Sequence, residues 1–183
     1  SASNFYSDFF IKVYRHGMPP GDKFYSRIKA GEQKIELLKK HVNLEEIQTV
    51  FEIGCSSGGV ICPFLTLGKV VGGCDYDADY IQCGIEKGLN LYQGRLDDKK
   101  VPDNSLDLLT LEHVSEHFLD PLTELEAIIA KVKPSKYLLI EIPSMMNLAQ
   151  SYKNPIKYFQ NAHTFCFFKK YLEAIFSHFG LII

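Results

Sequence analysis

A glycine-rich stretch directly after a short apolar run most constrains how this chain can fold. Residues 49–53 (TVFEI) are mostly apolar and run into Gly54, after which the chain continues as CSSGG to Gly59. An apolar run bounded by glycine is typical of a buried strand, and a turn of small residues lets backbone N–H groups approach a ligand closely. A helix after such a turn directs its positive end toward the same place. The pattern therefore predicts a strand, a ligand-binding turn and a helix in succession.

Short apolar runs alternate with helical patterns along the rest of the chain. We expect further strands at residues 69–74, 89–93, 106–111 and 137–142, and the beginning of another at 181–183. We expect helices at residues 32–41, 59–67, 77–88, 121–132 and 168–179. This alternation is typical of an α/β fold with a parallel sheet covered by helices on both faces. Ligands of such sheets bind at the carboxyl ends of the strands.

The bulk properties of the chain limit its classes of partner. Its 183 residues fit one domain, and its formal net charge of −2 gives no overall attraction to nucleic acid or anionic membranes. We find no apolar run long enough to cross a bilayer and no export leader, so we expect a cytoplasmic protein. The five cysteines are odd in number and include no Cys-x-x-Cys pair. We therefore expect free thiols in a reducing compartment rather than disulfides or structural zinc.

An acidic residue marks the end of the second expected strand. Asp75 follows Gly54 by about twenty residues, at the place where a carboxylate accepts hydrogen bonds from the hydroxyls of a ribose. Together the turn and the carboxylate predict a nucleoside cofactor. The dinucleotide fingerprint Gly-x-Gly-x-x-Gly needs a second glycine where this chain has Ser56, and a Gly-Lys-Ser/Thr phosphate loop is also absent. A nucleoside ligand without phosphate fits the sequence better.

Five segments resemble, in order and spacing, the class I (Rossmann-like) S-adenosylmethionine (SAM)-dependent methyltransferases of the small-molecule type. They are residues 50–59 around the glycine-rich turn, 71–77 around Asp75, 104–121 with the sequence EHVSEHFLDP, 133–143 with Lys-Pro before a strand, and 162–165 with AHTF. The resemblance covers residues 32–183. One departure is Ser56, which stands where the family has its middle glycine. Because of this departure, a relative that has lost activity stays an alternative.

The resemblance implies a three-layer α/β/α sandwich. Its mostly parallel sheet has the order 3-2-1-4-5 with strand 6 at the end, and the seventh strand of the family is missing, so the fold is expected to be C-terminally incomplete. It also implies that residues 1–43 form an N-terminal helical cap segment and that residues 44–183 form the SAM-binding methyltransferase domain, within a single domain overall.

The resemblance also assigns cofactor roles by position. Glu52 is expected to support the turn and to reach the amino group of SAM, Asp75 to hold the ribose hydroxyls, and Tyr76 to pack against the adenine. The remaining expected cofactor-binding residues are Gly54, Cys55, Ser56 and Gly58 at the methionine and ribose portions, Leu96 and Asp97 at the adenine edge, and Glu112 and His113 beside the transferable methyl group.

Histidines and acidic residues follow the fourth expected strand. His113 is the candidate general base for an acceptor hydroxyl, with cofactor packing as an equal alternative. His117 is expected to fix its own loop, and His163 to overhang the cleft as an acceptor contact, a carboxylate partner or a lid residue. Glu112, Glu116 and the two nearby histidines lack the spacing of a strong ligand set such as His-Glu-x-x-His, so we predict no metal.

We therefore expect a SAM-dependent methyltransferase that acts on a small-molecule or saccharide acceptor, at oxygen, and releases S-adenosylhomocysteine (SAH). No basic stripe with interleaved aromatics is present, so neither nucleic acid nor a membrane is an expected partner, and the oligomeric state stays open. Two alternatives remain. One is a non-catalytic SAM-fold scaffold, and the other, disfavoured by the missing dinucleotide glycine, is a nucleotide-cofactor oxidoreductase.

Overall fold

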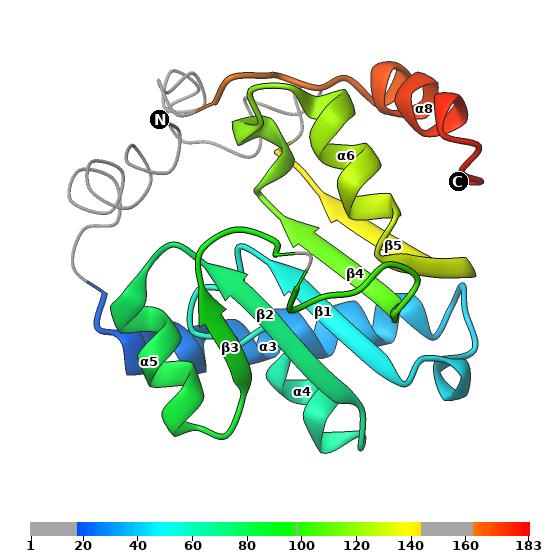
Figure 1. Ribbon diagram of the computed structural model, residues 1–183. Coiled ribbons are helices and arrows are strands. Elements are labelled where there is room, and N and C mark those ends of the chain that lie inside the picture. Colours follow the sequence, from blue (N-terminus) through cyan, green and yellow to red (C-terminus); the bar gives the residue numbers. More distant parts are fainter. Residues whose placement is uncertain (1–17, 98, 144–162) are drawn as a thin grey trace.

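A computed structural model describes residues 18–97, 99–143 and 163–183 of the chain (Figure 1). Residues 1–17 of the expected N-terminal cap segment lie outside the described part. No helix in the described part is both long and apolar enough to cross a bilayer.

Five parallel strands form one sheet with the order β3-β2-β1-β4-β5, as predicted (Figure 1). The strands are β1 (Thr49–Ile53), β2 (Val70–Asp75), β3 (Asn90–Gln93), β4 (Leu106–Glu112) and β5 (Val132–Glu141). Ile53, the last residue of β1, is in register with Cys74 on one side and Leu111 on the other. The carboxyl ends of the three central strands therefore lie together at one edge of the sheet.

Helices connect the strands and lie on both sides of the sheet. They are α3 (Pro20–Leu38), α4 (Cys62–Thr66), α5 (Ala78–Glu86), α6 (Pro121–Ile129) and α8 (Lys169–His178), with short 3-10 helices η2 (Leu44–Glu46) and η3 (Ser115–His117). The side chain of Asp77 accepts hydrogen bonds from the N–H groups of Asp79 and Tyr80, so Asp77 is the N-cap of α5. Pro63 lies in the first turn of α4, as its missing N–H requires.

The core follows the two-residue period of the strands. On one face Val50, Val71 and Leu108 pack with buried residues of α3, α4 and α5. On the other face Phe51 and Leu109 pack with Ile128 of α6. This arrangement is the predicted three-layer sandwich. Because Phe24, Ile35 and Leu38 of α3 join the same core as the central strands, the region expected to be a cap contributes directly to the sheet's packing, and the boundary at residue 43 stays a prediction.

Three predicted elements differ by five residues or more in the structure. The helix expected to begin at residue 32 begins at Pro20, where proline is tolerated because its N–H would have no helical partner in the first turn. Strand β5 begins at Val132 rather than at residue 137. The strand expected at residues 181–183 is not formed. Ile182 is fully exposed there (101%), and the Leu181 N–H donates to the Phe176 carbonyl at the end of α8, so this tripeptide has neither a buried face nor a neighbouring strand to pair with.

Candidate active site

The turn after β1 is built from residues in the left-handed region. Gly54, Ser56 and Gly58 have φ angles of 73°, 53° and 79°. A Cβ on Gly54 would lie 2.5 Å from the Cγ2 atom of Val114, so the segment after β4 lies directly against the turn. A Cβ on Gly58 would lie 2.4 Å from the side chain of Leu89. Glycine is therefore required at both positions by conformation and by space.

Ser56 occupies the left-handed position at which the family has its middle glycine. A residue with a Cβ pays about 1–2 kcal/mol for that conformation. The Ser56 hydroxyl is also buried, and it has no hydrogen-bond partner within the described residues. The departure from glycine thus adds backbone strain and a buried hydroxyl without a hydrogen-bond partner among the described residues.

Asp75 at the end of β2 lies beside this turn. Its carboxylate accepts hydrogen bonds from the N–H of Ser56 at 2.8 Å and from the N–H of Asp77 at 3.0 Å. The Asp75 residue is only 5% exposed. The N–H groups of Gly54 and Cys55 both donate to the carbonyl of Cys74, at 2.8 and 3.1 Å. The two features that the sequence placed side by side are therefore in direct contact.

Glu52 lies one residue before the end of β1 with its carboxyl group buried. Burial raises the pKa of Glu52 to about 8, while the positive charges of Lys34 and Arg27 act in the opposite direction. The Oε2 atom has no hydrogen-bond partner within the described residues. Glu52 is therefore protonated at neutral pH, so that it can both donate and accept a hydrogen bond.

Cys55 does not present its thiol to a ligand. Its side chain packs in the core with Val50 and Val71, and burial raises the pKa of the thiol well above its usual range. Any contribution of Cys55 to a cofactor site comes from its backbone. All five cysteines are free thiols, as expected.

Glu112 at the end of β4 is held by two cations of α3. Arg27 contacts one carboxylate oxygen of Glu112, and the buried Lys34 lies 3.1 Å from the other. Lys34 also donates to Glu141, the last residue of β5, at 2.7 Å. Sequence reasoning did not single out Arg27 or Lys34. Their spacing of one heptad places both on the face of α3 that meets the strand ends, and this spacing is the signal that could have found them.

His113 follows Glu112 with a left-handed φ of 54°. Its Nδ1 atom lies 3.5 Å from Glu116 and its Nε2 atom 3.6 Å from Glu141. The nearby carboxylates of Glu116 and then Glu141 raise the pKa of His113 to about 9, and the interaction with His113 is the main cause that lowers the pKa of Glu141 to about 2. A raised pKa favours the protonated imidazole, the form that cannot act as a base, and the base role expected for His113 stays a prediction.

The residues expected around the adenine lie after β2 and β3. Leu96 and Asp97 line an open hollow of about 440 Å³ together with Tyr92, Arg95 and lysines 99 and 100. The Asp97 N–H donates to the Tyr92 hydroxyl at 3.2 Å. Tyr76 is half-buried, and its backbone carbonyl accepts from the Gln93 side chain. Tyr76 is not among the residues that line this hollow, so the structure brings Leu96 and Asp97 together but does not place Tyr76 with them.

Comparison with known proteins identifies the family. A family model described as a methyltransferase domain matches residues 25–183. The chain belongs to this methyltransferase family. The Rossmann-like SAM-dependent methyltransferase class expected from the resemblance is thereby confirmed, and with it the fold. No curated protein gives a significant match.

Solved structures with the same fold carry varied activities. A SAM-dependent methyltransferase of Archaeoglobus fulgidus is 25% identical, with a TM-score of 0.62 over 82% of this chain and 68% of that one. Magnesium protoporphyrin IX methyltransferase of Synechocystis, solved with bound SAH, is 16% identical, with a TM-score of 0.61 over 97% and 86%. Phosphoethanolamine N-methyltransferase 2 of Haemonchus contortus, also with SAH, is 18% identical, with a TM-score of 0.68 over 95% and 44%.

Proposed function

We propose that the protein transfers a methyl group from SAM to an oxygen of a small-molecule or saccharide acceptor. The observation that carries the proposal is the hydrogen bond between the Ser56 N–H and the Asp75 carboxylate, at 2.8 Å. It joins the turn after β1 to the acidic end of β2 at the edge where parallel sheets bind ligands. The carboxylate oxygens of Asp75 have further lone pairs that can accept from ribose hydroxyls.

The polar atoms around the turn fit an adenosyl-methionine ligand. Glu52 Oε2 and Ser56 Oγ are both buried without a hydrogen-bond partner within the described residues. Buried polar atoms of this kind cost free energy unless a ligand or water satisfies them. SAM offers an amino group, a carboxylate and two ribose hydroxyls. The protein groups that can bind them are the protonated carboxyl of Glu52, the hydroxyl of Ser56 and the carboxylate of Asp75.

The other cofactor contacts follow the positions of the family. In the proposal Tyr76 packs against the adenine, Leu96 and Asp97 frame its edge next to the hollow after β3, and Gly54 and Gly58 allow close backbone approach. These assignments remain proposals, and each is accessible to substitution. The absence of a nucleic-acid or membrane partner is likewise proposed from the mild charge of the chain.

The proposed reaction depends mainly on the alignment of the acceptor oxygen with the methyl group of SAM. SAM supplies a methyl group on a sulfonium, which an acceptor oxygen displaces in line while the bonding electron pair returns to sulfur. The chain's own contribution is to hold both partners at the strand ends in that geometry, an effect that can supply several kcal/mol of a barrier. Because the imidazole of His113 lies between the carboxylates of Glu116 and Glu141, which raise its pKa, we propose that it orients the loop after β4 and that the acceptor proton leaves to water.

Calorimetry with SAM, SAH and NAD, followed by an assay of SAH release against hydroxyl, amine and sugar acceptors, tests the proposal. We expect micromolar binding of SAM and SAH, no binding of NAD, and turnover with a hydroxyl acceptor. Binding of NAD alone would favour an oxidoreductase. Absence of nucleoside binding would favour a scaffold, and turnover confined to amines would overturn the choice of oxygen.

A further inference from the structure

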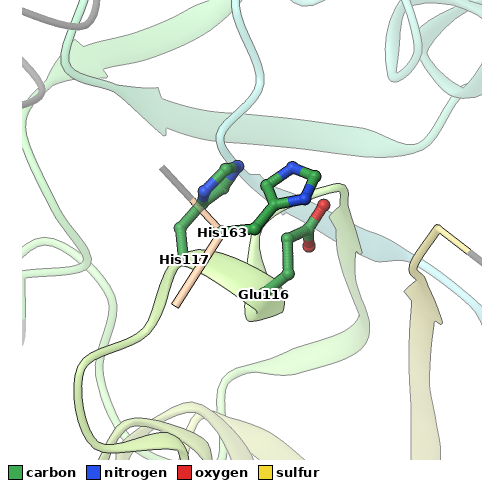
Figure 2. Close-up of side chains that lie close together, drawn as sticks. All are labelled: Glu116, His117 and His163. Carbon is green, nitrogen blue, oxygen red and sulfur yellow. The ribbon is translucent and has the colours of Figure 1, made fainter. Parts of the chain in front are cut away.

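A buried carboxylate and two imidazoles converge beside the candidate active site (Figure 2). Glu116 and His117 lie on η3, directly after β4, and His163 comes from the segment that precedes α8. The potential ligand atoms of the three side chains all lie within 4.8 Å of one another. The two imidazole rings have their centroids 5.1 Å apart.

Backbone hydrogen bonds hold the two segments together. The N–H groups of Thr164 and Phe165 both donate to the carbonyl of Glu116, at 2.8 and 3.1 Å. The residue after His163 is therefore tied to the residue that carries the carboxylate. Main-chain hydrogen bonds therefore hold the two segments that carry the three side chains next to each other.

The carboxylate of Glu116 is the unexplained group at this place. The residue is 1% exposed, and neither carboxylate oxygen receives a hydrogen bond within the described residues. The imidazole of His113 lies near, but its Nδ1 atom is 3.5 Å from Oε1, which is longer than a well-formed hydrogen bond, and its Nε2 atom faces Glu141 at 3.6 Å. Buried carboxylates are normally paired, hydrogen-bonded or bound to a metal.

We propose that Glu116, His117 and His163 bind a divalent transition-metal ion of the zinc class. Two imidazole nitrogens and one carboxylate form a three-ligand protein set that zinc accepts, with water in the fourth position. Magnesium and calcium prefer sites made only of oxygen. Ligand atoms of a tetrahedral zinc site lie about 3.3 Å apart, as its bond lengths of about 2.0–2.1 Å imply. The three potential ligand atoms already lie within 4.8 Å of one another, so binding of the ion would draw them closer together.

A second cluster of potential ligands shows why this one is chosen. Glu112, His113 and Glu141 also have ligand atoms within 4.8 Å of one another. However, Arg27 and Lys34 already neutralise Glu112, and Lys34 donates to Glu141. A cation there would have to compete with two cations that the fold supplies.

The inference departs from the sequence-based expectation of no metal. That expectation weighed only the residues close together after β4, namely Glu112, His113, Glu116 and His117. The third ligand of the proposed site, His163, comes from a segment far along the chain, which no local spacing rule detects. The bound ion would clamp the segment before α8 to the end of β4.

Cobalt substitution tests the site directly. Protein freed of metal with a chelator is titrated with Co²⁺ and Zn²⁺, while the visible absorption of Co²⁺ and the melting temperature are recorded. We expect one ion per chain, visible bands of the intensity of four-coordinate Co²⁺, and a rise in melting temperature with Zn²⁺. His163→Ala and Glu116→Gln should each weaken binding at least tenfold, whereas His178→Ala, at an exposed position on α8, should leave it unchanged.

Two results of the metal titration would overturn the proposal. Absence of a stoichiometric Co²⁺ spectrum in the wild-type chain would overturn the proposal, as would binding that persists undiminished in both ligand variants. Because substitution of a buried carboxylate can disturb folding, circular dichroism is recorded for each variant, and His117→Ala provides a further ligand variant at a half-buried position.

Discussion

Ser56 and Asp75 are joined by a hydrogen bond of 2.8 Å from the Ser56 backbone N–H to the Asp75 carboxylate. The N–H points at Asp75 because Ser56 adopts a φ of 53°, a conformation that glycine adopts without strain. The serine therefore keeps the geometry of the family's turn, at the expense of backbone strain.

Substitution of Ser56 should separate the conformational requirement from the chemistry of the hydroxyl. Ser56→Gly should be as stable as the wild type or more stable, since glycine relieves the left-handed strain. Ser56→Val should lower the free energy of unfolding by about 1–2 kcal/mol, because a β-branched residue is disfavoured there. Urea unfolding measures both. Equal stability of the valine and glycine variants would contradict the left-handed turn.

The buried carboxyl group of Glu52 should make stability depend on pH. Its pKa is raised to about 8 in the folded state, so the folded protein holds this proton more tightly than the unfolded chain does. The contribution is complete below the unfolded pKa of about 4.3 and is lost as pH rises toward 8. Between pH 5 and 8 the free energy of unfolding should fall more steeply for the wild type than for Glu52→Gln. Parallel pH profiles would show that Glu52 is not buried as described.

Asp107 should be a strong point of stability away from the site. One carboxylate oxygen accepts from the N–H groups of Gln48 and Thr49, each at 2.9 Å, and the other accepts from Lys133 at 2.9 Å. Asp107→Ala removes the acceptor of these three hydrogen bonds and should lower the free energy of unfolding by about 2–4 kcal/mol. Glu124→Ala, which breaks an exposed pair with Arg95, is the matched control and should change stability by less than about 1 kcal/mol. Chemical denaturation that gives equal losses would contradict the burial of Asp107.

The ion pair of Lys34 and Glu112 should couple α3 to the end of β4. Because both side chains are largely buried, Lys34→Met and Glu112→Gln should each destabilise the fold by about 3 kcal/mol. The double variant should lose less than the sum, since neither charge is then left unpaired. Urea denaturation of the four proteins gives the coupling energy. A value near zero would show that the pair contributes nothing.

Sequence patterns could predict the sheet because its signals are local. Residues 49–53 form β1 as expected, and Asp77 caps α5. The contact between the turn at Gly54 and Asp75 also follows from the pattern, because parallel strands bring their carboxyl ends to one edge.

What the patterns could not supply are contacts across the sheet edge. Arg27 lies in the first part of α3, before the start expected at residue 32. Lys34 falls inside the expected helix, but its ion pairs are with Glu112 and Glu141 at the ends of two strands. The raised pKa of His113 depends in part on Glu141, which lies at the end of β5. The strand expected at residues 181–183 required a pairing partner that three apolar residues do not specify.

Calorimetric titration of SAH into the wild-type chain and into Asp75→Asn tests the central claim most directly. The control is Asp79→Asn, an exposed residue in the first turn of α5. Circular dichroism and melting curves establish that each variant is folded. We predict micromolar binding to the wild type and to the Asp79 variant, and at least tenfold weaker binding to the folded Asp75 variant. Equal affinity of the folded Asp75→Asn protein for SAH would contradict the assignment of this turn and carboxylate as the adenosyl site.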